Sequence, residues 1–301
     1  MDKTATAGPV AIGFVGLGAM GSQLAARLLD GNTLIGTNRT ADKAIRLVEQ
    51  GMIWRDTPRE VAAQTHVVFS MVTDDAALDA ITRGPDGILA GLTPGAIYID
   101  MSTVSPRASR ALADDVHALG ASMLDAPVSG SVPAAVDGTL TIMVGGPSEA
   151  YAQVEPLLRR LGRTVDHAGG NGQALLLKLA INISLATQML AFSEGVLLAE
   201  HGGIDPALAA RVMTNSPIGS PMLQSRAALV LDLPERAWFD VALMHKDIRL
   251  ALATADELGI PAPSAATADR VLAAAEQLGY AHRDIAALYQ VLSHTTPAPA
   301  A

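Results

Sequence analysis

The chain has 301 residues, of which 50% are hydrophobic, 3% aromatic and 17% charged, with a formal net charge of −9. This length allows about two domains with separate cores. The chain contains no cysteine, which excludes disulfides, thiolate metal ligands and cysteine catalysis, and we predict no metal site. The negative charge argues against nucleic acid or an anionic membrane as a partner.

A glycine-rich loop follows the first apolar run of the chain. Residues 10–15 predict a strand and residues 22–29 an amphipathic helix, and between them lie the glycines of a G-x-G-x-x-G pattern. Missing side chains let a pyrophosphate approach the amides of a helix N-terminus. The sequence therefore predicts a dinucleotide site. Its cofactor-binding residues in this loop are Gly16, Gly18, Ala19 and Met20.

The end of the second predicted strand indicates which dinucleotide binds. An NAD site places an acidic residue there for the ribose 2′-hydroxyl, whereas this chain has Asn38, Arg39 and Thr40. A guanidinium binds a 2′-phosphate that a carboxylate would repel. We predict NADP(H) over NAD(H), although an ordinary surface arginine at a strand end would give the same sequence.

Short apolar strands alternate with helical stretches over the first half of the chain. The predicted strands are residues 10–15, 33–37, 66–71, 96–100, 122–126 and 139–144. Such alternation predicts a mostly parallel α/β sheet wrapped by helices, and the strand signals stop after about Asn171. We predict a doubly wound Rossmann domain over residues 1–170 and an all-helical domain over 171–301, entered by a helix from about residue 173.

The apolar segment 174–192 has the length of a membrane span but carries Lys178, Asn182 and Gln188. A central lysine opposes insertion by about 2.5–3.5 kcal/mol, so we predict a buried helix of a soluble protein. Residues 1–9 lack the apolar region of a secretory signal, which favours a cytoplasmic location. Residues 294–301 are expected to be disordered.

Three further stretches carry groups suited to chemistry. Ser105 and Pro106 predict a helix N-cap, which places Ser102 and Thr103 at the carboxyl end of a strand, where α/β sheets bind ligands. Residues 129–131 (Ser-Gly-Ser) precede another helix start and could bind a carboxylate or form only a turn.

Lys178 and Asn182 are four residues apart, so they share one face of an otherwise apolar helix. A single lysine there could reach solvent, but the amide one turn away favours a polar cleft. Burial would also suit the lysine to proton transfer.

Together these motifs resemble the β-hydroxyacid dehydrogenase family, over about residues 10–292. The similarity rests on segments 16–21, 100–106, 125–131 and 138–146, on Lys178 with Asn182, and on Lys246 with Asp247. It implies that Lys178 is the catalytic acid/base and that Asn182, Ser129, Gly130 and Ser131 bind the substrate. It also implies cofactor contacts for Met71, Val72, Thr103 and Lys246.

The chain departs from the family pattern near this lysine and in the carboxylate loop. Gly172 lies six residues before Lys178, whereas the family usually has four. The family pattern therefore does not fix the residue at which this helix begins. Ser131 replaces a usual glycine, and Ile181 stands where an asparagine is common. These differences bear on the choice of substrate.

The resemblance implies hydride transfer between NADP(H) and a small 3-hydroxy acid or aldehyde acid. Two alternatives stay open. Imine reductases share this architecture but usually lack a lysine at position 178, and a non-catalytic NADP(H)-binding module would also bind the cofactor. The apolar helices expected at residues 248–258 and 265–278 favour a homodimer or homotetramer formed through the helical domain.

Overall fold

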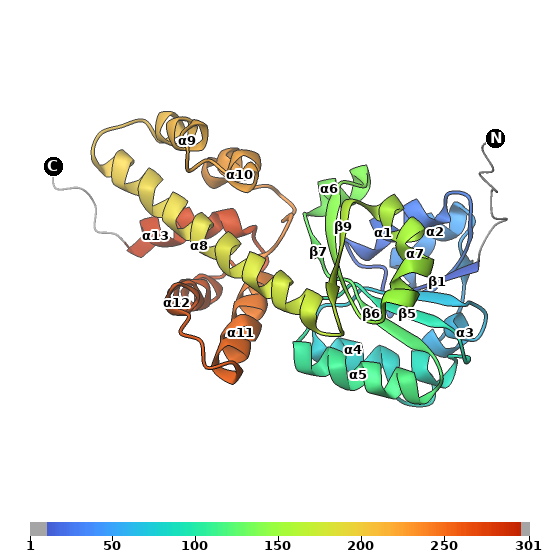
Figure 1. Ribbon diagram of the computed structural model, residues 1–301. Helices are drawn as coiled ribbons and strands as arrows, with labels where there is room; N and C mark the ends of the chain where they lie inside the picture. The colour runs from blue at the N-terminus through green and yellow to red at the C-terminus, as the bar shows by residue number, and fades with distance from the viewer. Residues whose placement is uncertain (1–10, 296–301) are drawn as a thin grey trace, which may run out of the picture. The chain divides into compact units, whose positions relative to one another are not determined.

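The computed structural model describes residues 11–295, which form two compact units that divide after Lys178, within one long helix. The first unit is an α/β sheet domain and the second is all-helical (Figure 1). This order confirms the predicted fold class. The predictions for residues 1–9, for Val10 and for most of the tail at 294–301 lie outside the described residues.

The first unit contains a mixed sheet with the strand order β3-β2-β1-β4-β5-β6-β8-β7, and β9 pairs with β8. Pairing is parallel from β3 through β6, whereas β8 runs antiparallel to β6 and β7. The strands are β1 (Ala11–Val15), β2 (Thr33–Thr37), β3 (Ile53–Trp54), β4 (Val67–Ser70), β5 (Ile97–Asp100), β6 (Ser122–Asp125), β7 (Val128–Ser129), β8 (Leu140–Gly145) and β9 (Gly162–Gly169).

Helices cover both faces of this sheet (Figure 1). They are α1 (Gly21–Leu29), α2 (Ile45–Glu49), α3 (Pro58–Ala62), α4 (Asp75–Thr82), α5 (Pro106–Ala118), α6 (Val132–Asp137) and α7 (Ser148–Leu161). Along β1, Phe14 belongs to the core under α1 and α7, while Val15 belongs to the core under α3, α4 and α5. Successive side chains of a strand point to opposite faces, so both faces of the strand are buried.

The second unit consists of helices around a separate core that includes Phe192, Met244 and Leu272. Its elements are α8 (Gln173–His201) from Leu179 onward, α9 (Pro206–Asn215), α10 (Pro221–Leu231), α11 (Val241–Glu257), α12 (Pro263–Gln277), η3 (Ile285–Ala287) and α13 (Leu288–Thr295). Within residues 11–295, α8 is the one helix long and apolar enough to cross a membrane by length and composition. Met189, Phe192 and Val196 on α8 are buried in the helical core.

Local sequence signals explain several helix starts. The Ser105 hydroxyl accepts a hydrogen bond from the Ala108 amide at 3.1 Å, and Pro106 is the first residue of α5, as predicted. Asp205, Ser220 and Asp240 cap α9, α10 and α11 in the same way.

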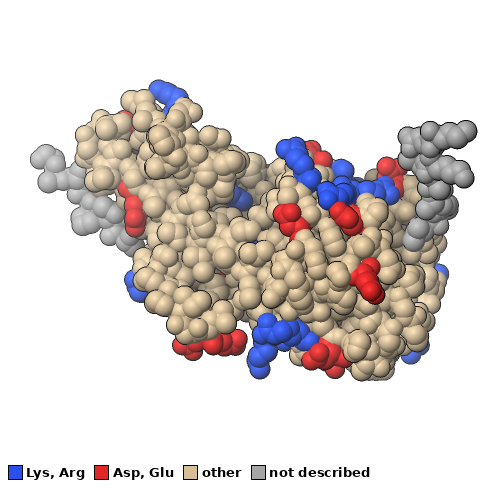
Figure 2. All heavy atoms as spheres, viewed as in Figure 1, with Lys and Arg blue, Asp and Glu red and all other residues tan. Residues whose placement is uncertain are grey.

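Charged side chains form small separate groups on the face shown in Figure 2, and most of that face is uncharged. This distribution agrees with the 17% of residues that carry charge. Large surface fields of one sign are what attract polyanions.

Candidate active site

The glycine-rich loop between β1 and α1 has the shape of a dinucleotide cradle. Gly16 has φ +96°, and a Cβ atom there would lie 2.3 Å from the Met71 carbonyl oxygen. A Cβ atom at Gly21 would lie 2.1 Å from the Gly16 carbonyl oxygen, whereas one at Gly18 would meet nothing within 4 Å. Gly16 and Gly21 are therefore required by the fold, and the space beside Gly18 fits the approach of a pyrophosphate.

Hydrogen bonds from two backbone amides bring the strand ends of the predicted cofactor site together. The Leu17 amide donates to Asn38 Oδ1 at 2.9 Å, which joins the glycine loop to the end of β2. The Met71 amide donates to the Val15 carbonyl oxygen at 3.0 Å, which joins the same loop to the end of β4. The side chains of Arg39 and Thr40 are exposed beside Asn38. The structure thus collects these predicted cofactor residues at one edge of the sheet.

A buried polar network supports the loops after β4 and β5. The Val72 amide donates to Ser102 Oγ at 2.9 Å, and the Ser102 hydroxyl donates to Asp100 Oδ1 at 2.6 Å. The Ser70 hydroxyl donates to the same carboxylate oxygen at 2.7 Å and lies 2.7 Å from the Tyr98 hydroxyl. Asp100 therefore fixes the backbone of Val72 and the loop that leads to Thr103.

The burial of Asp100 changes its acidity. Desolvation raises the pKa of this carboxyl from 3.8 to about 6, against the opposing hydrogen bonds from Ser102 and Ser70, and the nearby charge of Asp125 raises it further. Burial and the Asp100 charge also raise the pKa of Tyr98. Asp100 Oδ2 is buried and accepts no hydrogen bond among the described residues.

The raised pKa of Asp100 predicts a pH-dependent stability of the first unit. The folded state binds the Asp100 proton more tightly than the unfolded chain, so this stabilisation is fully present below pH 3.8 and is lost as the pH rises through 6. The loss amounts to about 3 kcal/mol. We expect the free energy of unfolding of the wild type, relative to Asp100→Asn, to fall by most of this amount between pH 4 and 7.

Urea denaturation at a series of pH values would measure this difference. In a Trp238→Phe background, Trp54 on β3 reports on the first unit alone, because the chain has two tryptophans. A constant difference between the two proteins from pH 4 to 7 would contradict the prediction.

The predicted carboxylate loop follows β6 and β7. Ser129 is the last residue of β7, and Gly130 has φ +128° with Leu140 Cδ2 only 2.6 Å from the place of a Cβ atom. Ser131 precedes α6, but its side chain does not cap that helix. The backbone at Gly130 thus requires glycine, and the Ser131 hydroxyl is not used as a helix cap.

Lys178 and Asn182 lie one turn apart on α8 and are both buried, with 8% and 0% of their surface exposed. Asn182 Nδ2 donates to Asp247 Oδ2 at 2.6 Å, and Lys246 Nζ lies 2.6 Å from Asp247 Oδ1. The buried Asp247 carboxylate therefore links two predicted site residues that are 64 positions apart in the sequence.

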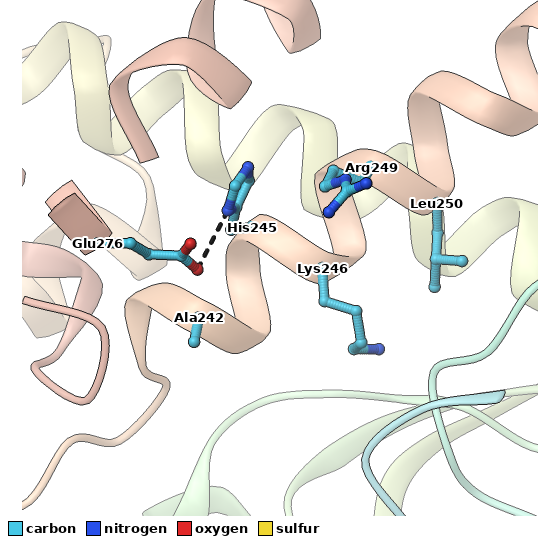
Figure 3. A pocket seen from close by; sticks show the side chains of 6 residues that line it. All are labelled: Ala242, His245, Lys246, Arg249, Leu250 and Glu276. Carbon is cyan, nitrogen blue, oxygen red and sulfur yellow. Dashed lines mark ion pairs between the residues drawn. The ribbon is translucent and has the colours of Figure 1, made fainter. Parts of the chain in front are cut away.

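A pocket of about 430 Å³ lies beside Lys246 in the second unit (Figure 3). Its lining residues are Ala242, His245, Lys246, Arg249, Leu250 and Glu276. His245 Nε2 lies 3.1 Å from Asp269 Oδ1 and Nδ1 lies 3.1 Å from Glu276 Oε1, which fastens α11 to α12. The lining thus combines the cationic side chains of Lys246 and Arg249 with the Glu276 carboxylate, and Lys246 is paired with Asp247.

Sequence reasoning assigned no role to the buried carboxylates Asp100, Asp125 and Asp247. Asp100 and Asp125 each end an apolar strand, and they are paired in the register of β5 and β6. Because an acidic residue at the end of a buried apolar strand is visible in the sequence, Asp100 and Asp125 could have been predicted. The contact of Asp247 with Asn182 depends on tertiary packing and has no local signal.

These features place the protein in the class of oxidoreductases that have a dinucleotide-binding α/β domain followed by a helical domain. Residues 11–169 match the family model of the NAD binding domain of 6-phosphogluconate dehydrogenase. Residues 170–292 match the model described as NAD-binding of NADP-dependent 3-hydroxyisobutyrate dehydrogenase. The chain belongs to the β-hydroxyacid dehydrogenase family of NAD(P)-binding oxidoreductases, as its motifs predicted.

Individual relatives match over most of the chain. It is 34% identical to a 3-hydroxyisobutyrate dehydrogenase of Pseudomonas aeruginosa, over 91% of this chain and 95% of that protein. It is 32% identical to the chloroplastic glyoxylate/succinic semialdehyde reductase 2 of Arabidopsis thaliana, over 95% of this chain and 80% of that protein. The crystal structure of a 3-hydroxyisobutyrate dehydrogenase from Salmonella typhimurium superposes with a TM-score of 0.85 at 27% identity, covering 94% of this chain and 99% of that chain.

Proposed function

We propose that this chain is an NADPH-dependent reductase of small aldehyde acids, or in reverse a dehydrogenase of 3-hydroxy acids, with Lys178 as the general acid/base. The observation that carries the proposal is the buried Lys178 with Asn182 on α8, in a chain whose first unit also has the glycine-rich loop of a dinucleotide site. A buried amine serves no packing purpose that an apolar side chain would not serve better.

The protein's residues would hold the cofactor and substrate as follows. The amides around Gly18 would bind the pyrophosphate, Arg39 the 2′-phosphate, and Met71, Val72 and Thr103 would line the remaining cofactor surface. Lys246 is proposed to contact the cofactor as well. NADPH, when bound, supplies the hydride that reduces the carbonyl carbon.

Proton transfer would belong to the protein. The Lys178 ammonium donates its proton to the carbonyl oxygen as that oxygen gains negative charge, and the amine then recovers a proton from solvent. Asn182 orients the substrate, and the Ser129–Ser131 loop binds its carboxylate through amides and hydroxyls. In the oxidative direction, the neutral amine accepts the hydroxyl proton instead.

A substrate panel would test this proposal. NADPH oxidation is followed with glyoxylate, succinic semialdehyde, methylmalonate semialdehyde, tartronate semialdehyde and a cyclic imine, beside NADP⁺ reduction with 3-hydroxyisobutyrate. We expect turnover with at least one aldehyde acid and a lower kcat/KM for the imine. Turnover of the imine alone would overturn the proposal in favour of an imine reductase. Tight NADPH binding without any turnover would overturn it in favour of a binding module.

The proposed NADP(H) preference predicts the effect of Arg39→Ala. The guanidinium would form charge-assisted hydrogen bonds to the 2′-phosphate, so we expect kcat/KM for NADPH to fall by about 10- to 100-fold. The value for NADH should stay nearly unchanged, because that cofactor lacks the phosphate. Steady-state kinetics with both cofactors measures the ratio, with Arg159→Ala on α7 as an exposed control. Equal losses for both cofactors would contradict the prediction.

We propose that the helical unit mediates formation of a homodimer or homotetramer. Exposed apolar side chains on its helices support this, among them Leu198 on α8 and Val212 on α9, with 77% and 58% of their surface exposed. The cytoplasmic location also stays a proposal.

A further inference from the structure

The carboxylate of Asp125 lies at the junction of three parts of the first unit. Asp125 is the last residue of β6 and is completely buried. The Ser129–Ser131 loop begins four positions later in the chain. The turn that leads into α8 packs against the same carboxylate.

Hydrogen bonds join Asp125 to the start of α8. Asp125 Oδ1 accepts from the Gly172 amide at 2.8 Å and from Asn171 Nδ2 at 3.3 Å. Asn171 Nδ2 also donates to the Met123 carbonyl oxygen at 2.9 Å, which ties the turn to β6 a second time. Because α8 begins at Gln173, the carboxylate is held at the positive end of the helix dipole.

The surrounding backbone leaves room for this carboxylate. A Cβ atom at Gly145, the partner of Asp125 in β8, would lie 2.7 Å from Asp125 Oδ2. Gly172 has φ +85°, a left-handed conformation that glycine adopts without strain. Burial raises the pKa of Asp125, and the hydrogen bonds from Gly172 and Asn171 oppose that rise.

We propose that Asp125 is a positioning residue for Lys178. It fixes the first turn of α8 on the end of β6, and Lys178 follows Gln173 by five residues, which is about 7.5 Å along a helix. The same strand end starts the chain segment that forms the carboxylate loop. Asp125 therefore sets the proton donor and the substrate loop relative to one another. This inference rests on the proposed function of Lys178.

The substitution Asp125→Asn tests the role, because asparagine keeps an acceptor oxygen but removes the charge. We expect kcat to fall by at least about tenfold, as for a small misplacement of a reacting group, with the Kd of NADPH changed by less than about twofold. The primary isotope effect on kcat with NADPH deuterated at the transferred position should increase, because the chemical step becomes slower relative to product release. A smaller amount of folded enzyme would leave that isotope effect unchanged.

Two further variants make the experiment decisive. Asn171→Ala removes only one donor to Asp125 and should show a smaller change in the same direction, even if Asp125→Asn folds poorly. Asp205→Asn is the matched control, since Asp205 caps α9 by accepting from the Leu208 amide at 2.8 Å. This control should leave both kcat and the isotope effect at their wild-type values.

Hydrogen exchange of peptides that cover residues 172–185 gives a readout without turnover, and we expect faster exchange in Asp125→Asn. An active wild type with unchanged kcat, isotope effect and exchange in Asp125→Asn would overturn the positioning role alone. Parallel losses of kcat and NADPH affinity with a constant isotope effect would do the same. A wild type that is inactive on the whole panel would instead overturn the proposed function, and the positioning role with it.

Discussion

Replacing Lys178 by alanine is expected to lower kcat by about 100- to 10,000-fold, the usual contribution of a general acid. Without the ammonium group, the oxygen of the reduced carbonyl gains charge with no proton donor beside it. NADPH binding should persist, because the cradle around Gly18 and the Arg39 side chain belong to other parts of the first unit. Stopped-flow reduction and fluorescence titration with NADPH would separate the two effects.

Two companion variants define what the lysine supplies. Lys178→Arg keeps the positive charge but holds its proton too tightly to release it, so it should stay nearly as inactive as the alanine variant. Glu194→Gln changes an exposed charge on the same helix and should have wild-type kcat. Near wild-type turnover of Lys178→Ala would show that another group donates the proton.

The largest loss of stability is expected for Asp284→Ala in the second unit. Arg226 Nη1 lies 2.6 Å from Asp284 Oδ1, and both side chains are buried. Asp284 also accepts from the backbone amides of Trp238, Phe239 and Ala286. The substitution leaves a buried guanidinium and three amides without their acceptor, which should cost about 3–5 kcal/mol.

Urea denaturation in a Trp54→Phe background measures this loss, because Trp238 then reports on the second unit alone. The double variant Asp284→Ala with Arg226→Met should recover part of the stability, since it no longer buries an unpaired charge. Arg270→Ala removes an exposed hydrogen bond to Thr267 on α12, in the same unit, and should change the free energy of unfolding by less than about 1 kcal/mol. A loss as small as that control in Asp284→Ala would contradict the prediction.

The sequence predicted the parts of the fold that have local signals. The glycine loop, the buried strands and the Ser105 cap each combine residue types in a short segment, and all three are present. The strands β3 and β7 were missed because each has only two residues. The strand β9 was missed because its side chains are mostly polar, and the antiparallel direction of β8 depends on pairing that a single segment does not encode.

The residues of the candidate site also fall into those that the local sequence indicates and those that only the folded structure reveals. Lys178 and Asn182 could be singled out because polar residues at helical spacing are conspicuous in an apolar segment. The Asp247 carboxylate that holds Asn182 lies 65 positions further along the chain, so only the folded helices reveal it. The elevated pKa of Asp100 likewise results from complete burial and neighbouring strands rather than from adjacent residues.

The three loop glycines do not carry equal information about a ligand. Gly16 and Gly21 would collide with the protein's own carbonyl oxygens if they bore a side chain, and Gly18 would not. A relative that lost the cofactor but kept the fold should therefore retain glycine at the positions of Gly16 and Gly21 and accept other residues at the position of Gly18. The residue at position 18 would then distinguish a relative that binds a nucleotide from one that has lost the site.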